Sequence, residues 1–357
     1  MKSQKNYKRI VVKIGSKLIA EQDGRCLDQI IKQLIELQDL DKEVILVSSG
    51  AIASALKKLN LSKRPKALSD LQALAAFGQV ELMNFYREIF LRFDKRCAQV
   101  LLTRDDFDDR RRYLNAKNTI SKLISMGIVA VVNENDTISV DEIKFGDNDI
   151  LSALVAILVE ADLLVILSTV DGLYEIDKKT KKWIKLICNV ENITEDIHKM
   201  SCKISDELSI GGMSSKINAA KIATNVGVKC ILANGTKSDV LLDIAKGHNP
   251  GTEFSEKSKG LVSRKRWIAF GTTSKGKIVV DNGAKEALLN RDCSLLAPGV
   301  IKVEGDFQAK DVVSIVDEDH NEFARGITNF SGKLLDETKG KRAKKEVVHR
   351  NDLVLLV

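Results

Sequence analysis

Short apolar runs alternate with amphipathic segments over the first two thirds of the chain. Runs of largely apolar residues, which are typical of buried strands, occur at 9–14, 43–47, 96–102, 128–132, 162–167 and 228–233. Between them, apolar residues recur at the spacing of a helix face over 26–40, 69–93, 113–126, 150–160, 217–226 and 238–245. Strands that alternate with helices predict an α/β fold, with a mainly parallel open sheet covered by helices on both faces.

The rhythm changes after residue 263. Residues 277–330 form short apolar segments separated by turn residues, without a long helix, and this pattern is typical of a small β-rich domain. The sequence therefore predicts an α/β domain over 1–263, a linker over 264–276 and a β-rich domain over 277–357.

Composition narrows the class of protein. Hydrophobic residues make up 44% of the chain and charged residues 29%, which is typical of a globular protein. No apolar run is long enough to cross a membrane, and the basic first residues lack the apolar core of an export signal, so we expect a cytoplasmic protein without membrane contact. The six scattered cysteines fit a reducing compartment. The net charge of +7 is spread over both domains, which suits small anionic ligands better than nucleic acid.

A polar cluster interrupts the apolar pattern between 133 and 149. Asn133, Glu134, Asn135 and Asp136 follow the strand at 128–132, and Gly146-Asp147-Asn148-Asp149 precedes the helix at 150–160. In open α/β folds the carboxyl edge of the sheet is where ligands bind. Asn and Asp oxygens can accept hydrogen bonds from an ammonium group or bind a metal, and Asn can also donate to a carboxylate. An ordinary turn followed by a helix cap would explain either half of the cluster alone.

Two lysines follow or precede glycine-rich turns elsewhere in the α/β domain. Lys13 is followed by Gly15 and Ser16, in a turn whose backbone N–H groups we expect to be free, and Lys216 ends the segment GGMSSK at a helix start. Both segments are typical of anion cradles, although simple capping is the alternative. Two lysines from different strand ends suit a transferring phosphoryl group, because this reaction needs positioning and charge neutralisation.

The motifs together carry a family resemblance. VVKIGS, VSSGAIA, LLTRDDF, NENDT, EIKFGDNDILSALVA, DGLY and GGMSSK occur in this order, and they closely resemble the glutamate 5-kinases of the amino acid kinase family. The segments KIVVDNGAKEALL and SLLAPGVIKVEG resemble the PUA domain that bacterial members often carry. The resemblance implies the amino acid kinase fold and Mg²⁺-dependent transfer of phosphate from ATP to L-glutamate. The product would be L-glutamyl 5-phosphate, at the start of proline synthesis, and proline often inhibits the family.

The resemblance also implies residue roles. Lys13 and Lys216 would stabilise the phosphoryl group in transfer, and Asp149 would orient them. The residues that would bind glutamate are Ser49, Gly50, Ala51, Asn133, Asp136 and Asn148. Those that would bind ATP are Lys13, Gly15, Ser16, Ser168, Thr169, Ile210, Gly211, Gly212, Met213, Ser214, Ser215 and Lys216. No residue is predicted to bind a metal directly, because the nucleotide would carry the Mg²⁺.

Two positions depart from the family pattern, both on the nucleotide side. The family usually has Asp at the position of Thr169 and Thr at the position of Ile210, and Asp171 and Asp162 are candidates to compensate for the missing Asp.

The long helix predicted over 69–93, interrupted at Gly78-Gln79, could kink, make a close helix contact or form a subunit interface.

The sequence leaves several partners and alternative functions open. We expect a dimer or tetramer, and a handover to a glutamyl phosphate reductase is possible. A kinase of the same family acting on aspartate or N-acetylglutamate is one alternative. RNA binding through the PUA-like domain, aided by the basic run 339–345, is another.

Overall fold

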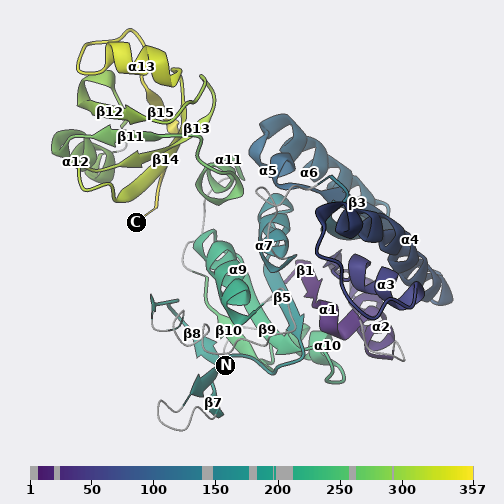
Figure 1. The fold of residues 1–357 in the computed structure, drawn as a ribbon. Coiled ribbons are helices and arrows are strands. Elements are labelled where there is room, and N and C mark those ends of the chain that lie inside the picture. The colour runs from purple at the N-terminus through teal and green to yellow at the C-terminus, as the bar shows by residue number, and fades with distance from the viewer. Residues whose placement is uncertain are drawn as a thin grey trace. The chain divides into compact units, whose positions relative to one another are not determined.

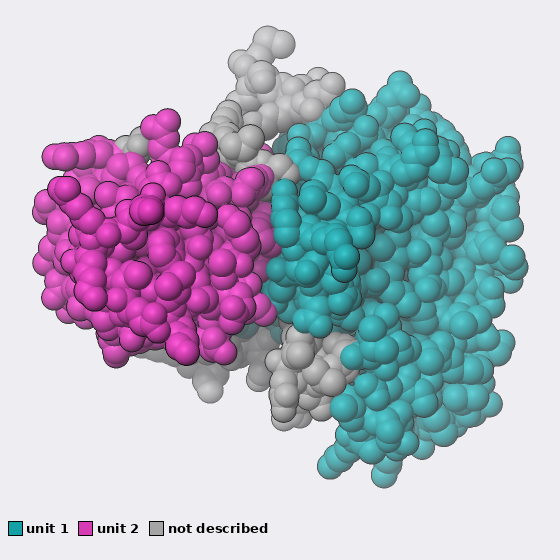
Figure 2. Space-filling model, turned by 90° about the horizontal axis from the view of Figure 1, so that it is seen from above, with its two compact units in different colours: residues 1–259 teal, residues 260–357 magenta. Residues whose placement is uncertain are grey.

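The computed structural model describes residues 7–19, 25–138, 148–176, 183–195, 197, 212–256, 263–291 and 293–356. The chain forms two compact units, residues 1–259 and 260–357, which Figure 2 shows in different colours. Among the described residues, no helix has the length and apolar character that crossing a membrane requires.

An eight-stranded sheet organises the first unit (Figure 1). Its spatial order is β3-β4-β2-β1-β5-β9-β10-β8. The strands are β1 (Arg9–Ile14), β2 (Glu43–Val47), β3 (Cys97–Leu102), β4 (Val129–Glu134), β5 (Leu163–Ser168), β8 (Asn189–Val190), β9 (Lys229–Asn234) and β10 (Thr252–Phe254). Along this spatial order, each pair of neighbouring strands from β3 to β9 is parallel, whereas β10 pairs antiparallel with β9. The predicted mainly parallel sheet is confirmed.

Helices cover both faces of this sheet. Within the described residues of the first unit, the helices are α1 (Ser16–Ile19), α2 (Arg25–Asp39), α3 (Ala51–Lys58), α4 (Leu68–Arg92), α5 (Arg104–Asp108), α6 (Arg110–Ser125), α7 (Asn148–Leu158), α9 (Met213–Asn225) and α10 (Val240–Ala245). Apolar residues of α2, α4 and α10 form one core with alternate residues of β1, Ile10, Val12 and Ile14. Since successive side chains of a strand point to opposite faces, Lys13 faces the other side, where it meets α7.

The region between β5 and α9 was not assigned from the sequence. It contains a two-stranded antiparallel hairpin, β6 (Tyr174–Ile176) with β7 (Trp183–Leu186), and the short edge strand β8. These strands have two to four residues. A strand this short carries too few alternating positions for a periodic signal.

The second unit contains a five-stranded sheet in the order β12-β11-β13-β14-β15. Its elements are α11 (Ser263–Arg266), a π-helix (Trp267–Gly271), β11 (Lys277–Val280), α12 (Asn282–Asn290), a 3₁₀ turn (Ala297–Gly299), β12 (Val300–Glu304), β13 (Val312–Val316), β14 (Glu322–Thr328), α13 (Gly332–Thr338) and β15 (Val348–Leu355). The predicted β-rich character is confirmed.

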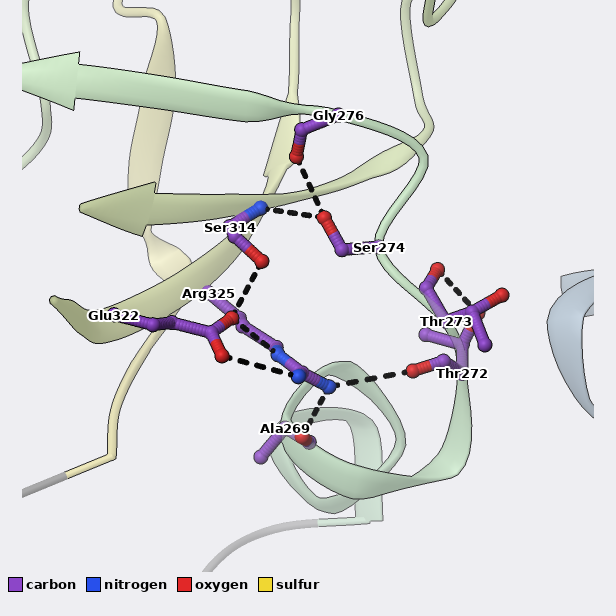
Figure 3. A network of polar contacts seen from close by, with 8 residues as sticks. All are labelled: Ala269, Thr272, Thr273, Ser274, Gly276, Ser314, Glu322 and Arg325. Atoms are coloured by element: carbon purple, nitrogen blue, oxygen red, sulfur yellow. Dashed lines mark hydrogen bonds and ion pairs between the residues drawn. The ribbon is translucent and has the colours of Figure 1, made fainter. Parts of the chain in front are cut away.

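The predicted linker 264–276 contains α11 and the π-helix, and it packs within the second unit. Trp267 and Ile268 are buried. Arg325 of β14 donates hydrogen bonds to the carbonyl oxygens of Ala269 (3.0 Å) and Thr272 (3.4 Å), as Figure 3 shows. These contacts tie the segment to the sheet of the second unit.

Candidate active site

One buried carboxylate joins two lysines from different elements. Asp149 is the second residue of α7, Lys13 lies near the carboxyl end of β1, and Lys216 lies in the first turn of α9. Lys13 Nζ forms an ion pair with Asp149 Oδ1, and Lys216 Nζ donates to Asp149 Oδ2 at 3.0 Å. All three side chains are buried, with exposed fractions of 4%, 0% and 9% for Lys13, Asp149 and Lys216. The sequence-predicted trio is therefore brought together.

The electrostatics of this trio favour an anion. Burial alone would raise the pKa of Asp149, but the ammonium groups of Lys13 and Lys216 outweigh it and hold that pKa below its usual range. Its place in the first turn of α7 also favours the negative form. Two ammonium groups thus converge on one buried carboxylate. A phosphate oxygen is a suitable hydrogen-bond acceptor for such ammonium groups.

Carboxamide side chains and a serine form a separate group, the carboxamide cluster, beside the trio. Asn148 Nδ2 lies within hydrogen-bond distance of Ser48 O (2.9 Å), Ser49 Oγ (3.0 Å) and Asn133 Oδ1 (2.9 Å). Asn133 belongs to β4, and Ser49 follows β2, so the carboxyl ends of two neighbouring strands meet Asn148 of α7. Because Asn148 directly precedes Asp149, the start of α7 contributes to both the trio and the carboxamide cluster.

The remaining residues predicted to bind glutamate lie near this cluster in the chain. Gly50 has φ +93°, a left-handed conformation that favours glycine, and it precedes the first residue of α3, buried Ala51. Asp136 is half-buried in the turn that follows β4. Residues 139–147, which include most of the predicted excursion over the pocket, lie outside the described residues.

The predicted nucleotide side is built from the ends of β1, β5 and α9. Ser168 ends β5, and Thr169 is exposed just beyond it. Gly212 precedes α9, and Met213, Ser214 and Ser215 form its start. Among the residues that the structure describes, Ser215 Oγ is buried without a hydrogen-bond partner. Such an orphaned hydroxyl is consistent with a ligand contact. Ile210 and Gly211 lie outside the described residues.

One expectation on this side is wrong. The N–H of Gly15 is not free for a phosphate, because it donates to the carbonyl oxygen of Leu167 at 3.1 Å and so extends the pairing of β1 with β5. A Cβ at Gly15 would lie 3.3 Å from that same oxygen. Gly15 therefore permits a close approach of two strands. Ser16 begins α1 and is exposed.

The two candidates to compensate for Thr169 differ in position. Asp162 precedes β5, at the amino edge of the sheet, and accepts hydrogen bonds from the backbone N–H groups of Lys8 and Arg9. It therefore lies at the wrong end of the strand. Asp171 lies beyond the carboxyl end of β5, and hydrogen bonds from Lys237, Asn234 and Tyr174 surround it. The hydrogen bond with Lys237 is the main reason that the pKa of Asp171 is lowered.

Sequence reasoning missed the contribution of α4 to the carboxamide cluster. Gln79 is buried, and its Oε1 accepts a hydrogen bond from Asn133 Nδ2 at 2.8 Å. Tyr86, on the same helix, shares a hydrogen bond of 2.7 Å with Ser48 Oγ. The only signal was the Gly78-Gln79 interruption in an apolar helix, which the structure explains as a close contact. A Cβ at Gly78 would lie 1.8 Å from Ala51 O.

Comparisons with known proteins fit this arrangement. Residues 8–234 match the amino acid kinase family, and residues 276–349 match the PUA domain. The chain belongs to the amino acid kinase family. The resemblance and the fold class predicted from the sequence are thereby confirmed.

Curated members of the family resemble the chain over its length. It is 43% identical over 363 residues to a glutamate 5-kinase of Thermoanaerobacter sp. (strain X514), with 98% of each chain covered. It is 44% identical over 366 residues to a glutamate 5-kinase of Dictyoglomus turgidum, again with 98% of each covered. Among solved structures, a carbamate kinase from Giardia lamblia bound to AMP-PNP matches with TM-score 0.50 and 17% identity, over 70% of this chain and 99% of that one. This last match supports the fold alone.

Members of an ATP-dependent kinase family commonly use Mg²⁺, and a resident ion would need oxygen ligands from the site residues. Within the described ranges, no group of three or more His, Cys, Asp or Glu side chains is arranged to bind a metal ion. Asp149 already carries two ammonium groups, which compete with a cation for its oxygens. Asp149 is therefore poorly suited to hold a resident metal ion.

Proposed function

We propose that this kinase transfers the γ-phosphoryl group of ATP to the side-chain carboxylate of L-glutamate, giving ADP and L-glutamyl 5-phosphate. The observation that carries the proposal is the pair of lysines held by one buried carboxylate, Lys13 and Lys216 on Asp149. The names of the curated relatives, all glutamate 5-kinases, support the choice of substrate.

The proposed reaction needs no protein base. A glutamate carboxylate oxygen, already ionised at neutral pH, attacks the γ-phosphorus, and the bond from that phosphorus to the bridging oxygen of ADP breaks. Negative charge moves toward the bridging oxygen and spreads over the transferring group. Lys13 and Lys216 neutralise this charge, and Asp149 holds both ammonium groups in place. Mg²⁺ on the nucleotide would shield the phosphate charges as the glutamate carboxylate approaches.

The carboxamide cluster is our candidate for the amino-acid end of the substrate. Ser49 Oγ accepts a hydrogen bond from Asn148, so its own proton is free to be donated to a carboxylate. The amide oxygen of Asn148 and the carboxylate of Asp136 are acceptors suited to an ammonium group, and Asn133 holds the amide of Asn148 in place. Glutamate carries both groups at one carbon. We infer that the side chain then extends toward Lys13.

Finer features of the proposal follow the family resemblance. They are inhibition by proline, assembly into a dimer or tetramer, transfer of the unstable product to a glutamyl phosphate reductase, and action in the cytoplasm. RNA binding is outside the proposal, because the kinase family match and the candidate site both lie in the first unit.

The test is a hydroxylamine-trapping assay with ATP and Mg²⁺, in which an acyl phosphate is converted to a hydroxamate. We expect a hydroxamate with L-glutamate and little with L-aspartate or N-acetyl-L-glutamate. Parallel reactions with proline and with EDTA test inhibition and the need for a divalent ion. Turnover with aspartate but not glutamate would overturn the assigned substrate, and no ATP-dependent hydroxamate with any of the three would overturn the assigned reaction.

A further inference from the structure

Four carboxamide side chains from four different elements form a continuous hydrogen-bonded chain behind the candidate glutamate site. Gln79 Nε2 of α4 donates to Gln99 Oε1 of β3 at 3.2 Å. Asn133 Nδ2 of β4 donates to Gln79 Oε1 at 2.8 Å, and Asn148 Nδ2 of α7 donates to Asn133 Oδ1 at 2.9 Å. Hydrogen bonds are thus donated in one direction, from Asn148 through Asn133 and Gln79 to Gln99.

Backbone groups at two points fix the direction of this chain. The N–H of Glu134 can only donate, and it lies 2.9 Å from Asn133 Oδ1, so the oxygen of Asn133 must be on that side. The carbonyl oxygen of Ser48 can only accept, and it lies 2.9 Å from Asn148 Nδ2. The amide nitrogen of Asn148 is therefore committed to the protein. The amide oxygen of Asn148 is therefore the group that can bind a ligand.

Asn148 Oδ1 is buried and has no hydrogen-bond partner among the residues that the structure describes. A buried acceptor without a donor is costly, because it loses its hydrogen bonds to water. A substrate group that can donate would remove this cost on binding. The ammonium group of an amino acid is such a donor, and charge assistance strengthens the bond.

Gln79 reaches this chain because α4 packs unusually close to α3. The preceding residue, Gly78, lies so near the first turn of α3 that even a methyl group would clash with Ala51 O. Leu82, one turn along α4, is buried in the main core. The position of Gln79 is therefore fixed by packing on both sides, and its amide serves as a rigid anchor for Asn133.

We propose that Gln79 is a positioning residue for substrate binding. It accepts from Asn133, which keeps the oxygen of Asn133 on Asn148 Nδ2 and so leaves Asn148 Oδ1 to accept from the α-ammonium group of the substrate. Without the Gln79 acceptor, the Nδ2 donor of Asn133 is buried and unpaired, and a shift of the Asn133 side chain toward water would relieve that penalty. The shift would draw Oδ1 of Asn133 away from Asn148 Nδ2 and displace Asn148. This inference rests on the proposed function, which supplies the ammonium group.

The experiment compares Gln79→Met with Gln79→Glu. Met has a similar size but accepts no strong hydrogen bond, whereas Glu presents an acceptor oxygen in either protonation state. We expect Gln79→Met to raise the KM for L-glutamate about tenfold, with kcat and the KM for ATP within about twofold of wild type, since a hydrogen bond to a charged group is worth that factor or more. Gln79→Glu should restore the KM for glutamate to within about threefold of the wild-type value, because Asn133 keeps its acceptor.

A matched control separates positioning from general packing. Leu82→Ala removes buried apolar contacts from the same helix and removes no hydrogen-bonding group. We expect it to lower the melting temperature and leave the KM for glutamate unchanged.

Three results would overturn the inference. The first is an unchanged KM for glutamate in Gln79→Met. The second is an equal rise in KM in Leu82→Ala. The third, which holds even if Gln79→Met fails to fold, is a tenfold rise in KM in a folded Gln79→Glu enzyme. Failure of the wild-type enzyme to phosphorylate glutamate would instead overturn the proposed function, so the two failures are distinguishable.

Discussion

Each unit contains an ion cluster that is at least partly buried, and the two clusters differ in charge balance. In the first unit, Asp149 faces the two ammonium groups of Lys13 and Lys216. In the second unit, Glu322 faces the single guanidinium of Arg325, through Nε at 2.7 Å and Nη2 at 3.3 Å. The first cluster brings two cations to one carboxylate, whereas the second pairs one guanidinium with one carboxylate.

The second cluster also satisfies its own donors, as Figure 3 shows. Arg325 Nη1 donates to the carbonyl oxygens of Ala269 and Thr272, and Ser314 Oγ donates to Glu322 Oε1. Ser274 Oγ in turn accepts from the N–H of Ser314 and donates to Gly276 O. This is the pattern of a structural network, in which binding a ligand would break existing bonds.

The comparison teaches how charge balance separates the two roles. A one-to-one ion pair whose groups also bond to the surrounding backbone stabilises the fold. A buried carboxylate shared by two lysines lies instead at the carboxyl ends of parallel strands, where such folds bind ligands, and it presents two ammonium groups to that edge of the sheet. The number of cations on one carboxylate and their place in the sheet therefore distinguish the functional cluster.

The largest effect is expected from removing the charge that holds the first cluster together. Asp149→Asn would leave two buried ammonium groups facing each other, and we expect the free energy of unfolding to fall by about 3–5 kcal/mol. We also expect kcat to fall by more than about 100-fold, because the lysines lose their anchor. Denaturant unfolding and the hydroxamate assay measure the two effects.

The control for Asp149→Asn is Asp39→Asn, which removes an exposed carboxylate paired with Lys95. We expect a change in unfolding free energy of less than about 1 kcal/mol there. Equal losses in the two variants would contradict the role of Asp149 as a shared anchor.

The second cluster should respond in stability alone. Arg325→Met leaves the partly exposed carboxylate of Glu322 without its cation, and we expect the free energy of unfolding of the second unit to fall by about 1–3 kcal/mol, a value discounted for that exposure. The fluorescence of buried Trp267, in a Trp183→Phe background, reports on this unit. Lys339→Met, which removes a surface ion pair with Asp336, is the control. A large loss of kcat without loss of stability in Arg325→Met would make the second cluster functional.

The smallest effect concerns pH. The lysines hold the pKa of Asp149 below its usual range, so its pairing contributes stability above the unfolded-state pKa of about 3.9, and this contribution is lost as pH falls through the lower folded-state pKa. We expect the difference in unfolding free energy between wild type and Asp149→Asn to be constant from pH 7 to pH 5 and to narrow below about pH 4. Narrowing between pH 7 and pH 6 would mean that burial raises the pKa instead.

Much of the first unit could be predicted because its signals are local. The strands and helices of the parallel sheet are long enough to show their period, and their observed limits lie close to those predicted. Lys13, Asp149 and Asn148 could be chosen because polar groups directly follow or precede buried elements. The family resemblance then supplied their roles, which stay predictions.

The rest depends on contacts that no local pattern encodes. Gln79 meets Asn133 across 54 positions of sequence, and only the packing of α4 on α3 brings them together. The commitment of the Gly15 N–H to Leu167 depends on which strand lies beside β1. The short strands β6, β7, β8 and β10 take their conformation from their neighbours.

The most direct test of the central claim, that Lys216 acts on the transferring phosphoryl group, is the kcat of Lys216→Met in the hydroxamate assay, measured with the free energy of unfolding of the same preparation. This change leaves one cation on Asp149, as Glu322 has one in the second cluster. We predict that kcat falls by about 100- to 1,000-fold while the free energy of unfolding is unchanged or higher. Wild-type kcat in a folded Lys216→Met enzyme would contradict the account.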